Sequence, residues 1–169
     1  MNNLAPVNPA TLTENVFSLI AEDWMLVTAG DMASYNTMTA SWGAMGELWN
    51  KKICICFVRP TRYTFEFMER TAAFTLSVFS EESRPVLNHC GNVSGRDVDK
   101  MHIAGLTPHQ SHAGSVYFEE ARLVFDCRKI YTHDLDPTKF LLQPIHDCYP
   151  KKDYHRMYIG EIVTCLSRD

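Results

Sequence analysis

The sequence predicts a mainly β protein, in which an antiparallel barrel or sandwich carries short helices in the connections between its strands. About six or seven segments show the apolar alternation or the short apolar runs that indicate strands, and about three or four have the pattern of short helices. The helices are scattered among the strands without regular alternation, which argues against a doubly wound parallel sheet. Because 46% of the 169 residues are hydrophobic, a single domain over 1–169 can bury a core.

The N-terminal part predicts one helix followed by one strand. Thr11 and Glu14 have the spacing of a capping box, and an apolar stripe follows them, so we expect a helix over about 13–21. The apolar run at 24–31 ends in a Gly-Asp turn signal and predicts a strand.

The next part of the chain predicts two strands and a further helix. Small polar residues alternate with larger ones over 35–42, which indicates a strand with one face rich in hydroxyl groups. We interpret 43–52 as a loop and the apolar run 53–58 as a buried strand. A charged turn, RPTR, then leads into a helix that ends near residue 70.

The rest of the chain predicts three strands and two short helices. Apolar alternation indicates strands at 72–79, 115–132 and 156–166. Cap and turn residues indicate helices at 80–91 and from Ser94 to Gly105. Pro85 suits the first turn of the former helix, and Gly91 suits its C-terminal end.

Charge and cysteine usage narrow the classes of function. A net charge of −4 lacks the basic excess of a free-standing nucleic-acid-binding protein, so any anion must be bound by a few placed groups. No apolar run approaches the ~20 residues that span a bilayer, and the N-terminal stretch lacks a signal-peptide pattern, so we expect a cytoplasmic protein with no membrane partner. The six cysteines contain no CxxC motif, and the histidines lack zinc-site spacing, so we expect reduced thiols and no metal.

Two polar segments in the first half are candidates for a binding site. Four of the seven side chains at 36–42 are Asn, Thr or Ser, which fits either an edge strand facing water or the lining of a flat heteroaromatic ligand. Arg59 and Arg62 flank the start of a helix that Thr61 or Thr64 can cap. This arrangement is either part of a phosphate site or a capped helix with two solvated arginines.

A third segment and one histidine complete the candidates. Residues 90–100 hold two glycines and a serine, with Arg96 and Lys100 at i,i+4 spacing. They form either an ordinary turn between helices or a second source of N–H groups and a cation for the same anion. His155 lies just before the last predicted strand, and taken alone it is interpreted as a surface histidine.

Taken in order, five motifs resemble one family. They are NTMTASWGAMGELW, VRPTRYTFEFMER, FTLSVF, CGNVSGRDVDKMHIAGLT and DYHRMYIGEIV. Over about residues 15–165, the chain resembles the flavin reductase-like domain of the FMN-binding split-barrel superfamily, and its flavoredoxin-like members above all. The resemblance implies a six-stranded antiparallel Greek-key barrel that forms a homodimer and binds FMN near each subunit interface.

The resemblance also implies a set of cofactor-binding residues. Those expected along the isoalloxazine ring and the ribityl chain are Asn36, Thr37, Met38, Thr39, Ser41 and Trp42. Those expected at the ribityl and phosphate end are Arg59, Arg62, Tyr63 and Thr64. Those expected to close over the phosphate are Ser94, Gly95 and Lys100, with Arg96 as a further candidate. His155 matches a histidine near the flavin, where nicotinamide or substrate docks, and is the one possible catalytic side chain.

The family resemblance implies a function, with alternatives. The first is an NADH- or NADPH-dependent flavin reductase that passes electrons to free flavin, a partner oxygenase or a metal chelate. The second is a flavoredoxin-like electron carrier, which keeps FMN bound, exchanges electrons with a redox protein partner and has no nicotinamide site of its own. The third is a binding or sensing module without redox turnover.

Overall fold

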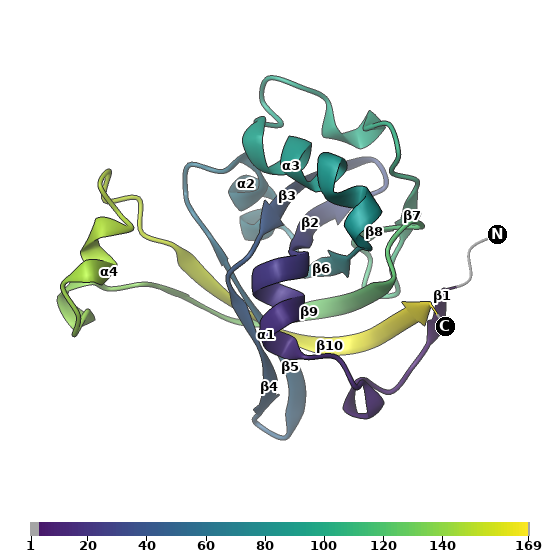
Figure 1. Cartoon of the computed structure of the whole chain (residues 1–169), viewed down its shortest axis with the longest axis horizontal. Coiled ribbons are helices and arrows are strands. Elements are labelled where there is room, and N and C mark those ends of the chain that lie inside the picture. Colours follow the sequence, from purple (N-terminus) through teal and green to yellow (C-terminus); the bar gives the residue numbers. More distant parts are fainter. Residues whose placement is uncertain (1–3, 169) are drawn as a thin grey trace.

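An antiparallel sheet of eight strands forms the body of the computed structural model, which describes residues 4–168 (Figure 1). Its strands are β1 Leu4–Pro6, β2 Met25–Asp31, β3 Ser34–Ala40, β4 Gly43–Leu48, β5 Lys51–Val58, β6 Ala73–Val78, β9 Leu123–Asp134 and β10 Arg156–Arg168. Seven of them follow the order β3-β2-β6-β9-β10-β5-β4, and β1 pairs with the end of β10. The predicted mainly β, antiparallel class is confirmed, although the sheet has more strands than the six expected.

The sheet curls so that its two end strands meet. β3 and β4 are the first and last strands of the order, yet only Ser41 and Trp42 separate them in the chain. Since consecutive Cα atoms are about 3.8 Å apart, so short a link holds the end of β3 close to the start of β4. The two ends of the sheet are therefore joined at this point by the chain, although β3 and β4 are not paired with each other, and side chains around this link border an opening.

Both faces of the central strands are buried. Met25, Val27 and Ala29 of β2 point into the core inside the barrel, whereas Leu26 points into a second core. Because successive side chains of a strand point to opposite faces, β2 separates the two cores. This explains why β2 is a near-continuous apolar run, whereas β6 is buried at every position although Thr75 and Ser77 alternate with its apolar residues. The strand predictions at 24–31 and 72–79 are confirmed.

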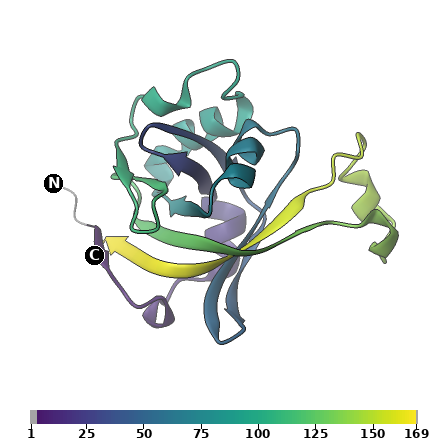
Figure 2. The ribbon, with the colours of Figure 1, turned by 180° about the vertical axis from the view of Figure 1, so that it is seen from behind.

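The helix α3 Arg84–Asn92 and a small second sheet, β7 Pro108–Gln110 with β8 Val116–Phe118, cover the second core (Figures 1 and 2). The helix α2 Tyr63–Arg70 instead packs against the core inside the barrel through Phe67 and Met68. Two 3-10 turns lie at Glu81–Ser83 and Lys100–His102. At the N-terminal end, a 3-10 turn at Pro9–Thr11 is followed by α1 Val16–Ser18, which continues as a π-helical turn over Leu19–Asp23.

The connection between β9 and β10 projects from the barrel as an arm, residues 135–155 (Figures 1 and 2). It contains a 3-10 turn at Pro137–Lys139 and the short helix α4 Pro144–Asp147. The sequence predicts no helix or strand in the arm. Its base is held by the pairing of Arg156 with Asp134, whose side chains form two hydrogen bonds at 2.7 and 2.8 Å.

The region predicted as a loop at 43–52 is instead a β-hairpin. β4 pairs with β5 from Gly43 and Cys56 to Leu48 and Lys51. Trp49 and Asn50 form the turn with φ of 53° and 57°, the left-handed values of a type I′ turn. Neither position is glycine, so the sequence lacks the usual signal for this turn.

Two predicted helices have different limits. Asn15, not Thr11, caps the first one, because its side chain accepts hydrogen bonds from the N–H groups of Phe17 and Ser18. Thr11 donates to Asn8 O instead. In α3, Pro85 lies in the first turn as predicted, but the helix continues past Gly91 to Asn92.

Two other long elements are interrupted. The helix expected from Ser94 to Gly105 is only a turn, in which Ser94 O accepts from Asp97 N and Val98 N, followed by the 3-10 turn Lys100–His102. The strand expected at 115–132 is split at 119–122 into β8 and β9, because the chain leaves the small sheet there and joins the large one.

Among residues 4–168, no helix is long and apolar enough to cross a membrane.

Candidate functional site

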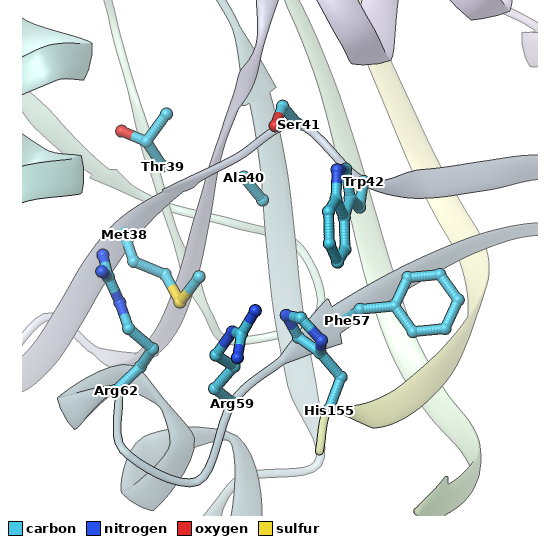
Figure 3. Close-up of a pocket in the computed structure, with 9 residues that line it drawn as sticks. All are labelled: Met38, Thr39, Ala40, Ser41, Trp42, Phe57, Arg59, Arg62 and His155. Carbon is cyan, nitrogen blue, oxygen red and sulfur yellow. The ribbon is translucent and has the colours of Figure 1, made fainter. Parts of the chain in front are cut away.

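Two adjoining cavities lie at the opening beside the β3–β4 link, and they share Met38 and Arg62. The first, the polar cavity, has a volume of about 250 Å³ and is lined by Asn36, Met38, Thr61, Arg62, Tyr63, Thr64, Asn92, Val93, Ser94, Gly95 and Lys100. The second, the aromatic cavity, has a volume of about 230 Å³ and is lined by Met38, Thr39, Ala40, Ser41, Trp42, Phe57, Arg59, Arg62 and His155 (Figure 3).

The three polar segments of the sequence meet in the polar cavity. β3 forms one wall, the turn from Thr61 into α2 forms the second, and the segment from the end of α3 to Lys100 forms the third. The first N–H groups of α2 have no acceptor inside the helix, and its N-cap, Arg62, makes no side-chain cap. The expected capping by Thr61 or Thr64 is therefore wrong, and this helix end can bind an anion.

Arg62 is the unpaired arginine of the site. Across residues 4–168, its guanidinium has no hydrogen bond, ion pair or ring contact, although the side chain is partly buried between the two cavities. Burial lowers the pKa of Arg62, as expected for a cation that has lost water without gaining a partner. An unpaired, desolvated guanidinium is well suited to bind a phosphate.

Arg59 and Arg96 already have partners within the protein. Arg59 donates to the Asp153 carboxylate at 2.8 Å and to Cys148 O at 2.9 Å, and its guanidinium lies 4.8 Å from the centre of the Tyr149 ring. Arg96 pairs with Glu66 on the surface and donates to Thr61 O. Arg59 thus lines the aromatic cavity while tethered to the arm, and Arg96 lines neither cavity.

Lys100 brings a buried ammonium to the floor of the polar cavity. Its side chain is only 3% exposed, and Nζ donates to Thr37 O at 2.9 Å and Cys90 O at 2.7 Å. Burial lowers the pKa of Lys100 to about 8. An ammonium has three N–H donors, so one remains for a ligand. These two hydrogen bonds direct the Lys100 side chain inward, and the chain here forms the short 3-10 turn Lys100–His102 in place of the predicted helix.

Asn36 and Gly95 hold two walls of the polar cavity together. Asn36 Nδ2 donates to Thr64 Oγ1 at 2.7 Å, which joins β3 to α2. Gly95 lies so close that a Cβ built on it would be 2.0 Å from Asn36 Oδ1 and 2.8 Å from the Tyr63 ring. Only a glycine fits at this position, because any side chain would push the third wall away from the other two.

Strand alternation places Thr37 outside both cavities. Asn36 and Met38 point into the polar cavity, so Thr37 points to the opposite face, where its hydroxyl lies 2.9 Å from the hydroxyl of Thr28. Thr39 borders the aromatic cavity, but its hydroxyl donates to Leu87 O of α3. The hydroxyls of Thr37 and Thr39 are therefore used for packing, although Thr39 and Ser41 also line the aromatic cavity.

The aromatic cavity is bounded by flat side chains (Figure 3). Trp42 is 47% exposed, and its ring centre lies 5.2 Å from that of His155. Phe57 lies on the other side of His155, at 6.4 Å between ring centres. Such a cavity provides apolar and π surfaces for a planar ligand.

His155 is buried, contrary to the interpretation of it as a surface residue. It is 8% exposed, and its Nδ1 lies 2.8 Å from the hydroxyl of Tyr149. Burial, with a smaller contribution from the Arg59 charge, lowers the pKa of His155 to about 4. The imidazole is therefore neutral at pH 7.

Several lining residues were not predicted. Asn92 and Val93 follow α3 and have no individual signal in the sequence. Phe57 occurs in an apolar run that indicates only burial, and Tyr149 reaches the site through the arm. A search for aromatic residues near the predicted histidine could have suggested Tyr149.

The antiparallel barrel places a helix start, Arg62 and Lys100 beside a cavity bounded by aromatic side chains, and the chemistry of this arrangement suits a planar, phosphorylated ligand. A family model described as flavin reductase like domain matches residues 17–169. The chain belongs to this family, which confirms the resemblance found in the sequence. No curated protein sequence matches the chain.

Solved structures show the same fold at low sequence identity. The flavoredoxin from Methanosarcina acetivorans has a TM-score of 0.70 and 18% identity, over 96% of this chain and 74% of that one. An FMN-binding domain of a flavin reductases-like enzyme from Shewanella baltica has a TM-score of 0.69 and 18% identity, over 99% and 78%. An NADH:FAD oxidoreductase from Streptomyces globisporus has a TM-score of 0.65 and 14% identity, over 85% and 73%.

Proposed function

We propose that this single-domain chain binds FMN and acts as an NADH- or NADPH-dependent flavin reductase-type oxidoreductase. Electrons then pass to free flavin, a partner oxygenase or a metal chelate. The observation that carries this proposal is the unpaired guanidinium of Arg62 at the junction of the two cavities. At this junction it would reach the phosphate of a ligand whose flat ring lies in the aromatic cavity.

The residues present fit FMN in chemistry. Arg62, the third N–H of Lys100 and the start of α2 would bind the phosphate, which carries a charge of about −2 at pH 7. The Ser94 hydroxyl accepts from Arg96 N at 3.1 Å and keeps its own proton to donate. Trp42 and Met38 would contact the ring, and Gly95 leaves room for the phosphate. When bound, FMN would supply the redox chemistry, and the protein orients it and excludes water.

The polar cavity favours a mononucleotide over FAD. It is closed on three sides by β3, α2 and the turn at Gly95, and its two available cations match one phosphate. Two similar structures are described as FMN-binding, whereas the one from Streptomyces globisporus is named an NADH:FAD oxidoreductase, so the choice of FMN rests on the cavity.

Spectroscopy and titration test the proposal. The purified protein should be yellow and release FMN on denaturation, or should bind added FMN in a fluorescence titration. Under anaerobic conditions, NADH or NADPH should then bleach the flavin absorbance. A protein that binds no flavin would refute the proposal, whereas a flavoprotein that neither nucleotide reduces would favour the second candidate below.

The second candidate is a flavoredoxin-like carrier that exchanges electrons with a redox protein partner. The observation favouring it lies in the outer groove, a space of about 380 Å³ that shares Trp42 and Phe57 with the aromatic cavity. Ile20, Leu135 and Tyr149 also line this groove, and within residues 4–168 no charged side chain does. Arg59, the nearest cation, is paired. A dinucleotide would find no free cation there for its pyrophosphate. Fast reduction of the bound flavin by reduced ferredoxin, together with slow reduction by NADH, would support the electron-carrier function.

We also propose that the chain forms a homodimer through its arm. Leu141 and Leu142 are 94% and 65% exposed on this projecting segment, which is unfavourable in a monomer. An apolar groove of about 340 Å³, lined in part by Leu12, Met45 and Ile162, offers a complementary surface on a second copy.

A further inference from the structure

The imidazole of His155 is exposed to ligands from one side only. Trp42, Phe57 and Tyr149 surround it with ring centres at 5.2, 6.4 and 5.5 Å, and the remaining side opens into the aromatic cavity (Figure 3). Of its two ring nitrogens, Nδ1 lies 2.8 Å from the Tyr149 hydroxyl. Nε2 is thus the nitrogen left for a ligand.

Hydrogen-bond accounting decides which nitrogen carries the proton. In the described part of the chain, the Tyr149 hydroxyl and His155 Nδ1 have no other hydrogen-bond partner than each other. If Nδ1 were protonated and donated, the buried hydroxyl proton of Tyr149 would have no acceptor, which is unfavourable. If the hydroxyl donates to Nδ1, both groups are satisfied, and the single proton of the neutral imidazole must be on Nε2.

The surroundings keep both groups neutral. Burial lowers the pKa of His155 to about 4 and raises the pKa of Tyr149. An imidazolium would also be repelled by Arg59, whose guanidinium is fixed against the Tyr149 ring by hydrogen bonds to Asp153 and Cys148 O. The arm residues 148–153 therefore clamp Tyr149 in place beside the cavity.

We propose that Tyr149 is a positioning residue that holds His155 as the Nε2–H tautomer, so that His155 presents a neutral hydrogen-bond donor to the aromatic cavity. The matching ligand is a heteroaromatic ring with a carbonyl or ring-nitrogen acceptor. This inference deepens the proposed function, because it assigns His155 the role of a donor and excludes that of a general base. A neutral donor also adds no further positive charge to a cavity that Arg59 and Arg62 already line.

The direct test is the tautomeric state of His155 by long-range ¹H–¹⁵N NMR at pH 7. The His155→Gln variant identifies the His155 signals among those of the seven histidines. We expect an unprotonated Nδ1 in the original protein and a mixture of tautomers in Tyr149→Phe, which keeps the ring packing. The matched control is Tyr154→Phe, since the Tyr154 hydroxyl has no hydrogen-bond partner within residues 4–168 and its ring lies 5.1 Å from that of Tyr149. It should retain the Nε2–H form.

Two results would overturn the proposal: a protonated Nδ1 in the original protein, or an unchanged tautomer in Tyr149→Phe. Because neither measurement needs a flavin, both remain decisive if the proposed function fails. In flavin-loaded protein that oxidises NADH, Tyr149→Phe should lower kcat about fivefold with FMN affinity unchanged, the effect of losing one hydrogen bond. An unchanged kcat would show that the donor is not used in turnover.

Discussion

Arg59 and Arg62 are three residues apart, yet only Arg59 is paired: its guanidinium donates to the Asp153 carboxylate at 2.8 Å. Asp153 belongs to the arm, so this contact joins the arm to the rim of the aromatic cavity. Arg62, without such a partner among residues 4–168, is left to bind a ligand. The two arginines that the sequence presents as equivalent therefore differ: Arg59 holds the arm, and Arg62 is the proposed anion-binding group.

The first prediction concerns Arg62. Replacing it with alanine should weaken FMN binding by about 1.5–3 kcal/mol, because a charge-assisted hydrogen bond is lost. The thermal stability of the flavin-free protein should change little, since the Arg62 guanidinium makes no hydrogen bond, ion pair or ring contact within residues 4–168. Fluorescence titration measures the affinity, and Arg128→Ala, which removes an exposed surface pair with Glu161 and lines neither cavity, is the control. Equal affinities for the original protein and Arg62→Ala would reject the assignment.

Lys100 predicts a pH dependence of FMN binding. Its pKa in the flavin-free protein is lowered to about 8, so the ammonium loses its charge as pH rises through 8. A phosphate dianion binds the protonated form better, and the FMN affinity should therefore fall between pH 7 and pH 9, by at most about tenfold per pH unit above the pKa.

Titrations of FMN at several pH values check this dependence. Lys100→Met should bind FMN more weakly at pH 7 and show no fall between pH 7 and pH 9. Lys52→Met, on the β4–β5 hairpin, is a control that removes a half-exposed lysine paired with Glu47. An original protein with constant affinity over this range would show that Lys100 does not touch the phosphate.

Gly95 should tolerate no side chain. In Gly95→Ala, the new Cβ would meet Asn36 Oδ1 at 2.0 Å, so the turn must move away from β3 and open the polar cavity. We expect FMN affinity to fall at least tenfold, or about 1.4 kcal/mol, and the melting temperature to decrease. Gly46→Ala is the matched control, because no atom lies within 4 Å of its added Cβ. If both variants bind FMN alike, the third wall is more adaptable than its close packing indicates.

Local patterns in the sequence were sufficient for most strands and for the three walls of the site. Alternation identifies β3 and β10, and the run RPTR with the following helix identifies the anion-binding turn. The β4–β5 hairpin was missed because Trp49 and Asn50 adopt left-handed conformations without a glycine. Such a turn is stabilised by the pairing of the flanking strands, which no local signal reports.

Long-range contacts account for the rest of what could not be predicted. The distinction between Arg59 and Arg62 depends on Asp153, which is 94 positions from Arg59 in the chain. The inward orientation of Lys100 depends on the carbonyl of Thr37, 63 positions away. His155 was misjudged for the same reason, since the arm that buries it carries Tyr149. Residue type and local spacing do not encode these pairs.

The arm provides the last prediction, which tests the proposed dimer. Leu141→Asp combined with Leu142→Asp should convert a dimer to a monomer in analytical ultracentrifugation, because two charges would be placed in an apolar interface. The monomer itself should remain folded, since both side chains are exposed in the single chain. Met32→Asp, an exposed apolar position in the turn between β2 and β3, controls for added charge and should stay dimeric. A double variant that still sediments as a dimer would place the interface elsewhere, and an original protein that is monomeric would leave the exposed leucines for a redox partner.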